Sequence, residues 1–185
     1  MLNLVPMRRE EDIPPPYRDT PVGDLIRYHN LGAAPRAYAR AELLVGMCMD
    51  NRKMLRVPEN FAYILRSGAA NLGRIEFKVS FAVAVGGVRA ICLLGHDRCG
   101  MVGLASRREE FVAGLVENGG WSRPEAETHF DRYAPIFDIG DPVEFVRSEA
   151  DRLRQRYPRV LVAPLMYDLE SGMLQCIERR RTHDA

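Results

Sequence analysis

The chain has 185 residues and a formal net charge of +1, because its 26 Lys or Arg residues nearly balance its 25 Asp or Glu residues. This length is that of one domain, and a charge so close to zero argues against a nucleic-acid partner, which needs a basic field. No apolar run approaches the roughly 18 residues of a membrane span or has the form of a signal peptide. We therefore expect no membrane partner and a cytoplasmic location.

Residues 1–19 are predicted to form an N-terminal extended arm, because charged residues precede the helix-breaking run from Pro14 to Pro16. Such an arm is either a disordered tail or a segment packed on a partner subunit. Residues 20–185 are predicted to form a single domain. It begins with a helix that Thr20 caps and Pro21 opens, and residues 35–42 are predicted to form a short second helix.

The next segments are predicted to build a parallel sheet. Residues 43–47 and 61–65 are apolar runs that indicate buried strands, and residues 91–94 form another. Between them, residues 74–87 alternate between apolar and small or polar side chains, which by period alone favours a strand. Parallel strands need a crossover of about a dozen residues, usually a helix, and this segment is the only one available. We predict a helix there, apolar nearly all round, with one side facing another subunit.

The remaining segments are predicted to complete the sheet and its helices. A helix is predicted to begin within residues 100–106, and a second over 122–133, where Ser122 and Glu125 form a capping box. Asp141 and Pro142 predict a helix that ends near residue 156, followed by strands over 160–165 and 173–177. The predicted fold class is α/β, a single domain whose central, mostly parallel sheet has about four parallel strands plus a C-terminal edge strand and is flanked by helices.

Two short motifs follow two of these strands directly. Cys48, Asp50 and Arg52 follow the first strand, and His96 and Cys99 follow the third. Because the carboxyl ends of parallel strands meet at one edge of a sheet, these side chains are expected to lie close together. Two thiolates and one imidazole suit zinc, and three protein ligands with an open fourth position are typical of a catalytic zinc. Asp50 is a nearby carboxylate for that position, and Arg52 is its expected partner.

Other kinds of site fit the sequence less well. A structural zinc usually has four Cys or His ligands in closely spaced pairs, whereas only three such residues converge here. The chain has no Cys-x-x-Cys redox motif and no Gly-x-Gly-x-x-Gly after the first strand. Cys92 and Cys176 lie inside apolar strands, so the four cysteines indicate reduced thiols. His129 is predicted to be structural or exposed, with proton transfer at the mouth of the site as the alternative.

The two motifs together resemble those of the β-class carbonic anhydrases. Members of that family carry Cys-x-Asp-x-Arg after the first strand and His-x-x-Cys-Gly after the third, and both stand here intact and in order. Residues 63–68, 141–146 and 167–172 are similar to further family segments. The resemblance covers roughly residues 40–178.

The resemblance implies one Zn²⁺ per subunit, held by Cys48, His96 and Cys99. It implies reversible hydration of carbon dioxide to bicarbonate and a proton, through attack by a zinc-bound hydroxide. In the family, the carboxylate and guanidinium at the positions of Asp50 and Arg52 pair with each other and orient that hydroxide. Some members show a closed state, in which the carboxylate at the position of Asp50 becomes the fourth zinc ligand.

The resemblance also suggests a substrate pocket and partners. We expect Tyr63, Gly68 and Gly100 to line the substrate pocket, and the chain to form a homodimer or a dimer of dimers. Two alternative functions remain at this point. The same zinc site would serve a hydrolase of carbonyl sulfide or carbon disulfide, favoured by a longer and drier access route, or the chain would be a non-catalytic bicarbonate-binding or assembly module.

Overall fold

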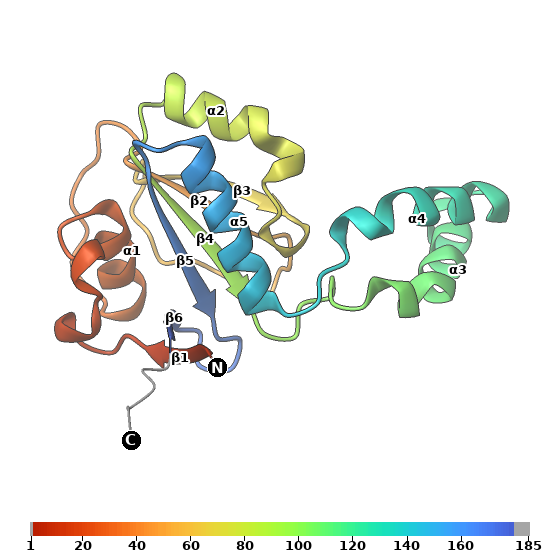
Figure 1. Ribbon diagram of the computed structural model, residues 1–185, viewed down its shortest axis with the longest axis horizontal. Coiled ribbons are helices and arrows are strands. Elements are labelled where there is room, and N and C mark those ends of the chain that lie inside the picture. Colours follow the sequence, from red (N-terminus) through yellow and green to blue (C-terminus); the bar gives the residue numbers. More distant parts are fainter. Residues whose placement is uncertain (1, 180–185) are drawn as a thin grey trace.

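The computed structural model describes residues 2–179, which form a six-stranded sheet with helices on both faces (Figure 1). The strand order is β1-β6-β5-β4-β2-β3. Strands β2 (Leu43–Cys48), β3 (Ala62–Ser67), β4 (Ala90–His96) and β5 (Leu161–Tyr167) are parallel. Strand β6 (Leu174–Arg179) runs antiparallel to β5. The predicted α/β class and the four parallel strands are confirmed.

The amino-terminal segment adds a sixth strand to this sheet. β1 (Leu2–Pro6) pairs antiparallel with β6 of the same chain, outside it, so the two edges of the sheet are β1 and β3. Two short 3₁₀ turns follow, η1 (Glu10–Asp12) and η2 (Pro15–Tyr17). Met7 and Ile13 are fully buried in the core. This segment is therefore folded onto its own chain, contrary to a disordered tail.

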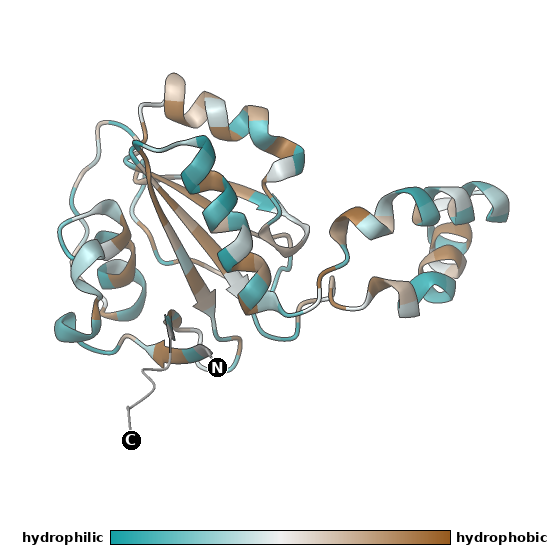
Figure 2. Ribbon diagram, in the orientation of Figure 1, coloured by the Kyte–Doolittle hydropathy of each residue, from teal (hydrophilic) through white to brown (hydrophobic). Residues whose placement is uncertain are grey.

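One face of the sheet is covered by α1 (Pro21–Asn30), and the other by α2 (Glu76–Ala84) and α5 (Pro142–Arg156). Thr20 caps α1 as expected, because its Oγ1 accepts a hydrogen bond from Val22 N at 3.2 Å. Asp141 caps α5 by accepting from Val143 N and Glu144 N, both at 2.8 Å. β2 and β4 are buried along their whole length, and Figure 2 shows the hydrophobic colour concentrated on the sheet.

The crossover between β3 and β4 is a helix, as the topology requires. α2 follows a short turn, η4 (Gly73–Ile75), and returns the chain so that β4 lies parallel to β2. Val79 and Ala82 face the core, whereas Phe77 is 81% exposed, and Phe81 and Val85 are also exposed. The alternation in the sequence reflects these two apolar faces rather than a strand.

The helix predicted over residues 35–42 is wrong. This segment has no regular secondary structure and bends at residues 39–40, and tertiary contacts hold it in place. The Tyr38 hydroxyl lies 2.7 Å from that of Tyr28, and the Arg36 guanidinium stacks on the Tyr38 ring at 4.0 Å. Such contacts outweigh the weak helical preference of eight residues.

A helical hairpin projects from the carboxyl edge of the sheet (Figure 1). It consists of a 3₁₀ turn η5 (Leu104–Arg107), α3 (Arg108–Gly119) and α4 (Arg123–Phe137). The helix expected within residues 100–106 therefore begins only at Leu104. Gly120 ends α3 with a φ of +69°, and the predicted capping box of Ser122 and Glu125 starts α4. Among the described helices, none is both long and apolar enough to cross a bilayer.

Candidate metal centre

The two neighbouring strands β2 and β4 each end in a residue of the predicted cluster. Cys48 is the last residue of β2 and His96 the last of β4, and Cys99 follows after a tight turn in which Arg98 has a φ of +50°. One ligand-type atom from each of the three residues lies within 4.8 Å of the others. All three residues are buried. The topology therefore brings these residues together as the sequence predicts.

The geometry of the cluster fits a tetrahedral metal ion. The Sγ atoms of Cys48 and Cys99 are 3.9 Å apart, and two thiolates bound to one zinc at about 2.3 Å would be about 3.8 Å apart. His96 Nδ1 lies 2.7 Å from the backbone oxygen of Asp97. Because a carbonyl only accepts, Nδ1 must donate, and Nε2 of the neutral ring carries a lone pair. Nε2 is buried and, among residues 2–179, has no hydrogen-bond partner, which a bound metal would supply.

The pKa values of the two thiols shift in opposite directions. The pKa of Cys48 falls to about 3, first because the Cys99 thiol donates a hydrogen bond to it. The same contact, followed by burial, raises the pKa of Cys99. Thiolates are the form that binds metal, so binding at this pair would release a proton.

Asp50 and Arg52 form an ion pair beside the cluster. Arg52 Nε lies 2.9 Å from Asp50 Oδ1, and the backbone N of Arg52 donates to the same oxygen at 2.9 Å. These contacts, the side-chain hydrogen bond first, hold the pKa of Asp50 far below its usual range. Asp50 Oδ2 lies 4.0 Å from His96 Nε2, yet Asp50 is not part of the compact ligand group. The carboxylate thus faces the cluster while Arg52 holds it.

Arg66 fixes the loop that carries this pair. Its Nη1 donates to the backbone oxygens of Cys48 and Asp50 at 3.2 and 3.1 Å, and its Nη2 donates to that of Lys53 at 3.1 Å. The sequence marks residues 63–68 only as a family-like segment. That Arg66 binds the backbone of this loop follows only from the structure, which places β3 within hydrogen-bonding distance of the loop.

Lys53 is a buried cation that sequence reasoning missed. Its side chain is 1% exposed, and its Nζ is, with His96 Nε2, one of two buried side-chain polar atoms without a partner in the described part of the chain. Burial is the main cause that lowers the pKa of Lys53. Lys53 and Lys78 are the only lysines in a chain of 24 arginines, which is the one sequence signal that could have drawn attention to it.

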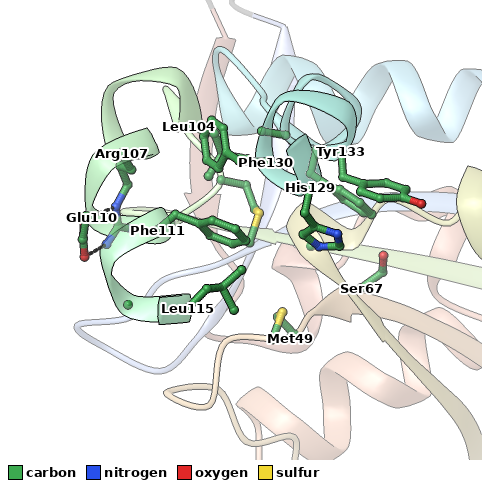
Figure 3. A pocket seen from close by; sticks show the side chains of 16 residues that line it. Met49, Ser67, Leu104, Arg107, Glu110, Phe111, Leu115, His129, Phe130 and Tyr133 are labelled. Atoms are coloured by element: carbon green, nitrogen blue, oxygen red, sulfur yellow. Dashed lines mark hydrogen bonds and ion pairs between the residues drawn. The ribbon is translucent and has the colours of Figure 1, made fainter. Parts of the chain in front are cut away.

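A cavity of about 640 Å³ adjoins the cluster, between the sheet edge and the helical hairpin (Figure 3). Met49 and Gly100, which directly follow Cys48 and Cys99, line it together with Gly68. Most of the remaining wall is apolar, including Phe111 and Phe137. Two of the three expected pocket residues, Gly68 and Gly100, therefore lie at this cavity.

The third expected pocket residue, Tyr63, lies elsewhere. It sits near the start of β3, 41% exposed, and its ring contacts the position of Gly86 after α2, where an added Cβ would meet Tyr63 Cε2 at 2.7 Å. The structure does not bring Tyr63 to the cavity, because three residues of β3 separate it from Ser67 at the carboxyl edge.

Comparisons with known proteins identify the fold. No protein-family model matches the sequence, and no curated protein matches it. Among solved structures, a carbonic anhydrase from Glaciozyma antarctica has a TM-score of 0.60 at 19% identity, covering 91% of this chain and 98% of that one. β-Carbonic anhydrase isoform I of Trichomonas vaginalis has a TM-score of 0.59 at 17% identity, covering 78% and 87%. A carbon disulfide hydrolase has a TM-score of 0.53 at 17% identity, covering 82% and 83%. The chain therefore has the fold of the β-carbonic anhydrases.

Proposed function

We propose that this chain is a zinc enzyme that reversibly hydrates carbon dioxide to bicarbonate and a proton. The observation that carries the proposal is the buried group of Cys48, His96 and Cys99, with an unpartnered imidazole nitrogen and a held carboxylate facing it. A donor set of two thiolates and one imidazole suits zinc and leaves one position for water.

Cys48, His96 and Cys99 would hold one Zn²⁺ in each subunit. When bound, zinc would supply a Lewis acid that makes water deprotonate near neutral pH, as in carbonic anhydrases with three histidine ligands, where the pKa of that water is about 7. Thiolates donate more charge to a metal than imidazoles do. Two thiolate ligands would therefore make the water in this site less acidic than three imidazoles would. Charged groups around the site would have to offset this effect.

Asp50 would orient the attacking oxygen. Its carboxylate stays ionised because Arg52 lowers its pKa, so it accepts a hydrogen bond from that oxygen and directs a lone pair at the carbon. Arg52 holds Asp50 in place and is itself fixed through the hydrogen bond from its Nη2 to the backbone oxygen of Arg98 at 3.1 Å. Release of Arg52 would free Asp50 to become the fourth ligand, which is the closed, inactive arrangement.

The cavity would deliver the substrate. Carbon dioxide is small, neutral and weakly hydrated, so an apolar wall beside Gly68 and Gly100 suits its entry. Bicarbonate is charged and would leave toward solvent past the exposed Arg52.

A second candidate is the hydrolysis of carbon disulfide or carbonyl sulfide by the same residues. The cavity favours it, because about 640 Å³ of mostly apolar space is far more than carbon dioxide needs. One of the structures with this fold is a carbon disulfide hydrolase. Both substrates are neutral molecules with an electrophilic carbon, so the proposed roles of Asp50 and Arg52 are unchanged.

The test is stopped-flow carbon dioxide hydration by purified protein of known zinc content, beside Asp50→Ala. We expect activity that rises with pH in the native protein and falls about a hundredfold or more in the variant. Full activity of Asp50→Ala contradicts its role. Stoichiometric zinc with no hydration, but release of hydrogen sulfide from carbon disulfide, supports the second candidate. Zinc without turnover of any of these substrates supports a non-catalytic module.

We also propose that the chain forms a homodimer or a dimer of dimers in the cytoplasm. The exposed Phe77 and Phe81 of α2 and Val85 directly after it support the assembly, because they form an apolar stripe at helical spacing. The four free cysteines support a reducing compartment.

A further inference from the structure

Each hydration event releases a proton, and the groups at the cluster are poorly suited to take it. Asp50 is bound by Arg52, which lowers its pKa. His96 donates through Nδ1 to Asp97 and offers Nε2 to the metal. A different titratable group must therefore carry the proton from the cavity to the solvent.

His129 of α4 lies where such a group is needed. Its ring lines the cavity that adjoins the cluster, and it also lines a shallow hollow on the outer surface with Pro124, Thr128 and Arg132. One imidazole thus contacts both the inner space and the outside. Imidazole is the side chain that gains and loses a proton most readily near neutral pH.

Aromatic rings hold the imidazole in this position. The ring stacks with Phe111, with centroids 6.2 Å apart and an interplanar angle of 10°. Trp121 meets it edge-on at 5.0 Å, and Tyr133 lies at 4.7 Å. Within the described range, the ring nitrogens have no hydrogen-bond partner from the protein, so they are available to water.

Ser67 offers a hydroxyl group on the wall of the cavity. Ser67 is the register partner of Cys48 in the pairing of β2 with β3, so it stands next to the metal centre. It also lines the cavity, and Figure 3 shows its hydroxyl pointing toward the side that holds His129 and Tyr133. A hydroxyl both donates and accepts, which suits a step in a chain of water molecules.

The charged groups that line the cavity and the outer hollow around His129 carry both signs. Arg107, at the end of η5, and Glu110 of α3 line the cavity, but they pair with each other at 2.8 Å. Glu125, Arg132 and Tyr133 face the ring from its own helix in the outer hollow. The lining residue from the segment before α4 is Trp121 and that from β3 is Ser67, and both are uncharged.

We propose that His129 accepts the proton released by hydration, through cavity water and Ser67, and passes it to buffer in the outer hollow. The inference rests on the proposed function. In this step a proton leaves the attacking water and one O–H bond breaks, while an N–H bond forms on the ring. Transfer of this proton from the ring to buffer restores the neutral imidazole. The step makes or breaks no bond to carbon and changes no oxidation state.

The test compares the native protein with His129→Phe, which keeps an aromatic ring at this position but cannot take up a proton. Tyr17→Phe, which removes a hydroxyl from a residue of η2 that lines neither the cavity nor the outer hollow, is the matched control. In dilute buffer we expect His129→Phe to lower kcat roughly tenfold to a hundredfold, with kcat/KM unchanged, because kcat/KM reports the interconversion of carbon dioxide and bicarbonate alone. Added imidazole should restore kcat, and Tyr17→Phe should behave as native.

A second readout does not depend on turnover. NMR of the His129 ring in the zinc-free protein should show its ring N–H exchanging rapidly with water, and a ring N–H that is protected from exchange would overturn the proposal. An active native protein whose kcat is unaffected by His129→Phe, or whose kcat and kcat/KM fall together without rescue by imidazole, overturns the proposal but not the proposed function. A zinc-loaded native protein without hydration activity overturns both.

Discussion

At the scale of single residues, two buried side-chain polar atoms stand out because neither has a hydrogen-bond partner among residues 2–179. His96 Nε2 belongs to a group of atoms that could hold a metal ion, and a bound ion would supply its missing partner. Lys53 Nζ has no such explanation. The sequence predicts the first, because the ends of parallel strands meet at one edge. It could not predict the second, because the path of the loop after Arg52 decides whether a lysine reaches solvent.

Replacing Lys53 tests whether its buried, unpaired amine lowers the stability of the fold. Lys53→Met keeps most of the side-chain volume and removes the polar group, so it should stabilise the protein by about 1–3 kcal/mol in urea unfolding at neutral pH. Because burial lowers the Lys53 pKa, the unfolded chain holds this proton more tightly than the folded one. The gain should therefore shrink as pH rises toward the ordinary lysine pKa of about 10.4.

Lys78→Met on the exposed surface of α2 is the control, with a change of at most about 0.5 kcal/mol. A Lys53→Met protein that is less stable than the native one would show that Nζ has a stabilising partner.

The metal ligands can be tested one cysteine at a time. Cys99→Ser should lose most of its zinc after dialysis, because a hydroxyl does not deprotonate as the thiol does and is a poor ligand for this metal. Zinc content per chain by atomic absorption is the measurement. Cys92→Ala, which changes a buried thiol inside β4 away from the cluster, should retain zinc. Equal zinc in both variants would exclude Cys99 from the site.

At the scale of elements, the close approach of α5 to β4 positions the histidine of the cluster. Gly95 precedes His96 in β4, and a Cβ at Gly95 would lie 2.6 Å from Val146 Cγ2 of α5 and 2.7 Å from Met166 Sδ of β5. Only a glycine lets the helix pack this closely at the end of the strand. The packing of a whole helix thus constrains one ligand.

Gly95→Ala should therefore affect stability and metal binding together. The added methyl should cost about 1–3 kcal/mol in urea unfolding and weaken zinc retention against a chelator, because His96 shifts with the strand. Gly140→Ala is the matched control, since no atom lies within 4 Å of the added Cβ. A Gly95→Ala protein with native stability and native zinc affinity would contradict this account of the packing.

The elements also show where sequence patterns stop being sufficient. For residues 74–87 the period favours a strand, and only the need for a crossover between parallel strands correctly favours the helix α2. For residues 35–42 no such constraint was available. The contacts of Tyr38 with Tyr28 and Phe61, which lie outside that segment, hold it in an irregular conformation.

At the scale of the whole molecule, α2 presents apolar side chains to solvent at the β3 edge of the sheet. Phe77 and Val85 are 81% and 70% exposed, and an apolar stripe of this kind is typical of a subunit interface. The sequence predicts this exposed apolar surface, because residues 74–87 are apolar on nearly every side of the predicted helix. It does not identify the surface on the partner subunit, because that depends on the geometry of assembly.

Charge placed on this stripe should weaken the proposed dimer. Phe77→Glu should lower the mass measured by light scattering toward that of one chain, or raise the dimer dissociation constant at least about tenfold, because burying an unpaired carboxylate is costly. Lys78→Glu, which changes an exposed neighbour on α2, should leave the mass unchanged. A native protein that is monomeric at micromolar concentration would contradict the assembly.

X-ray absorption at the zinc edge tests the central claim most directly, because every proposed role depends on the metal and its ligands. The account predicts one zinc per chain, with two sulfur ligands at about 2.3 Å and one nitrogen and one oxygen at about 2.0–2.1 Å. In Cys99→Ser the sulfur count of any retained zinc should fall to one. Four sulfur or nitrogen ligands with no oxygen would contradict a catalytic centre, and a chain that takes up no zinc would contradict the site itself.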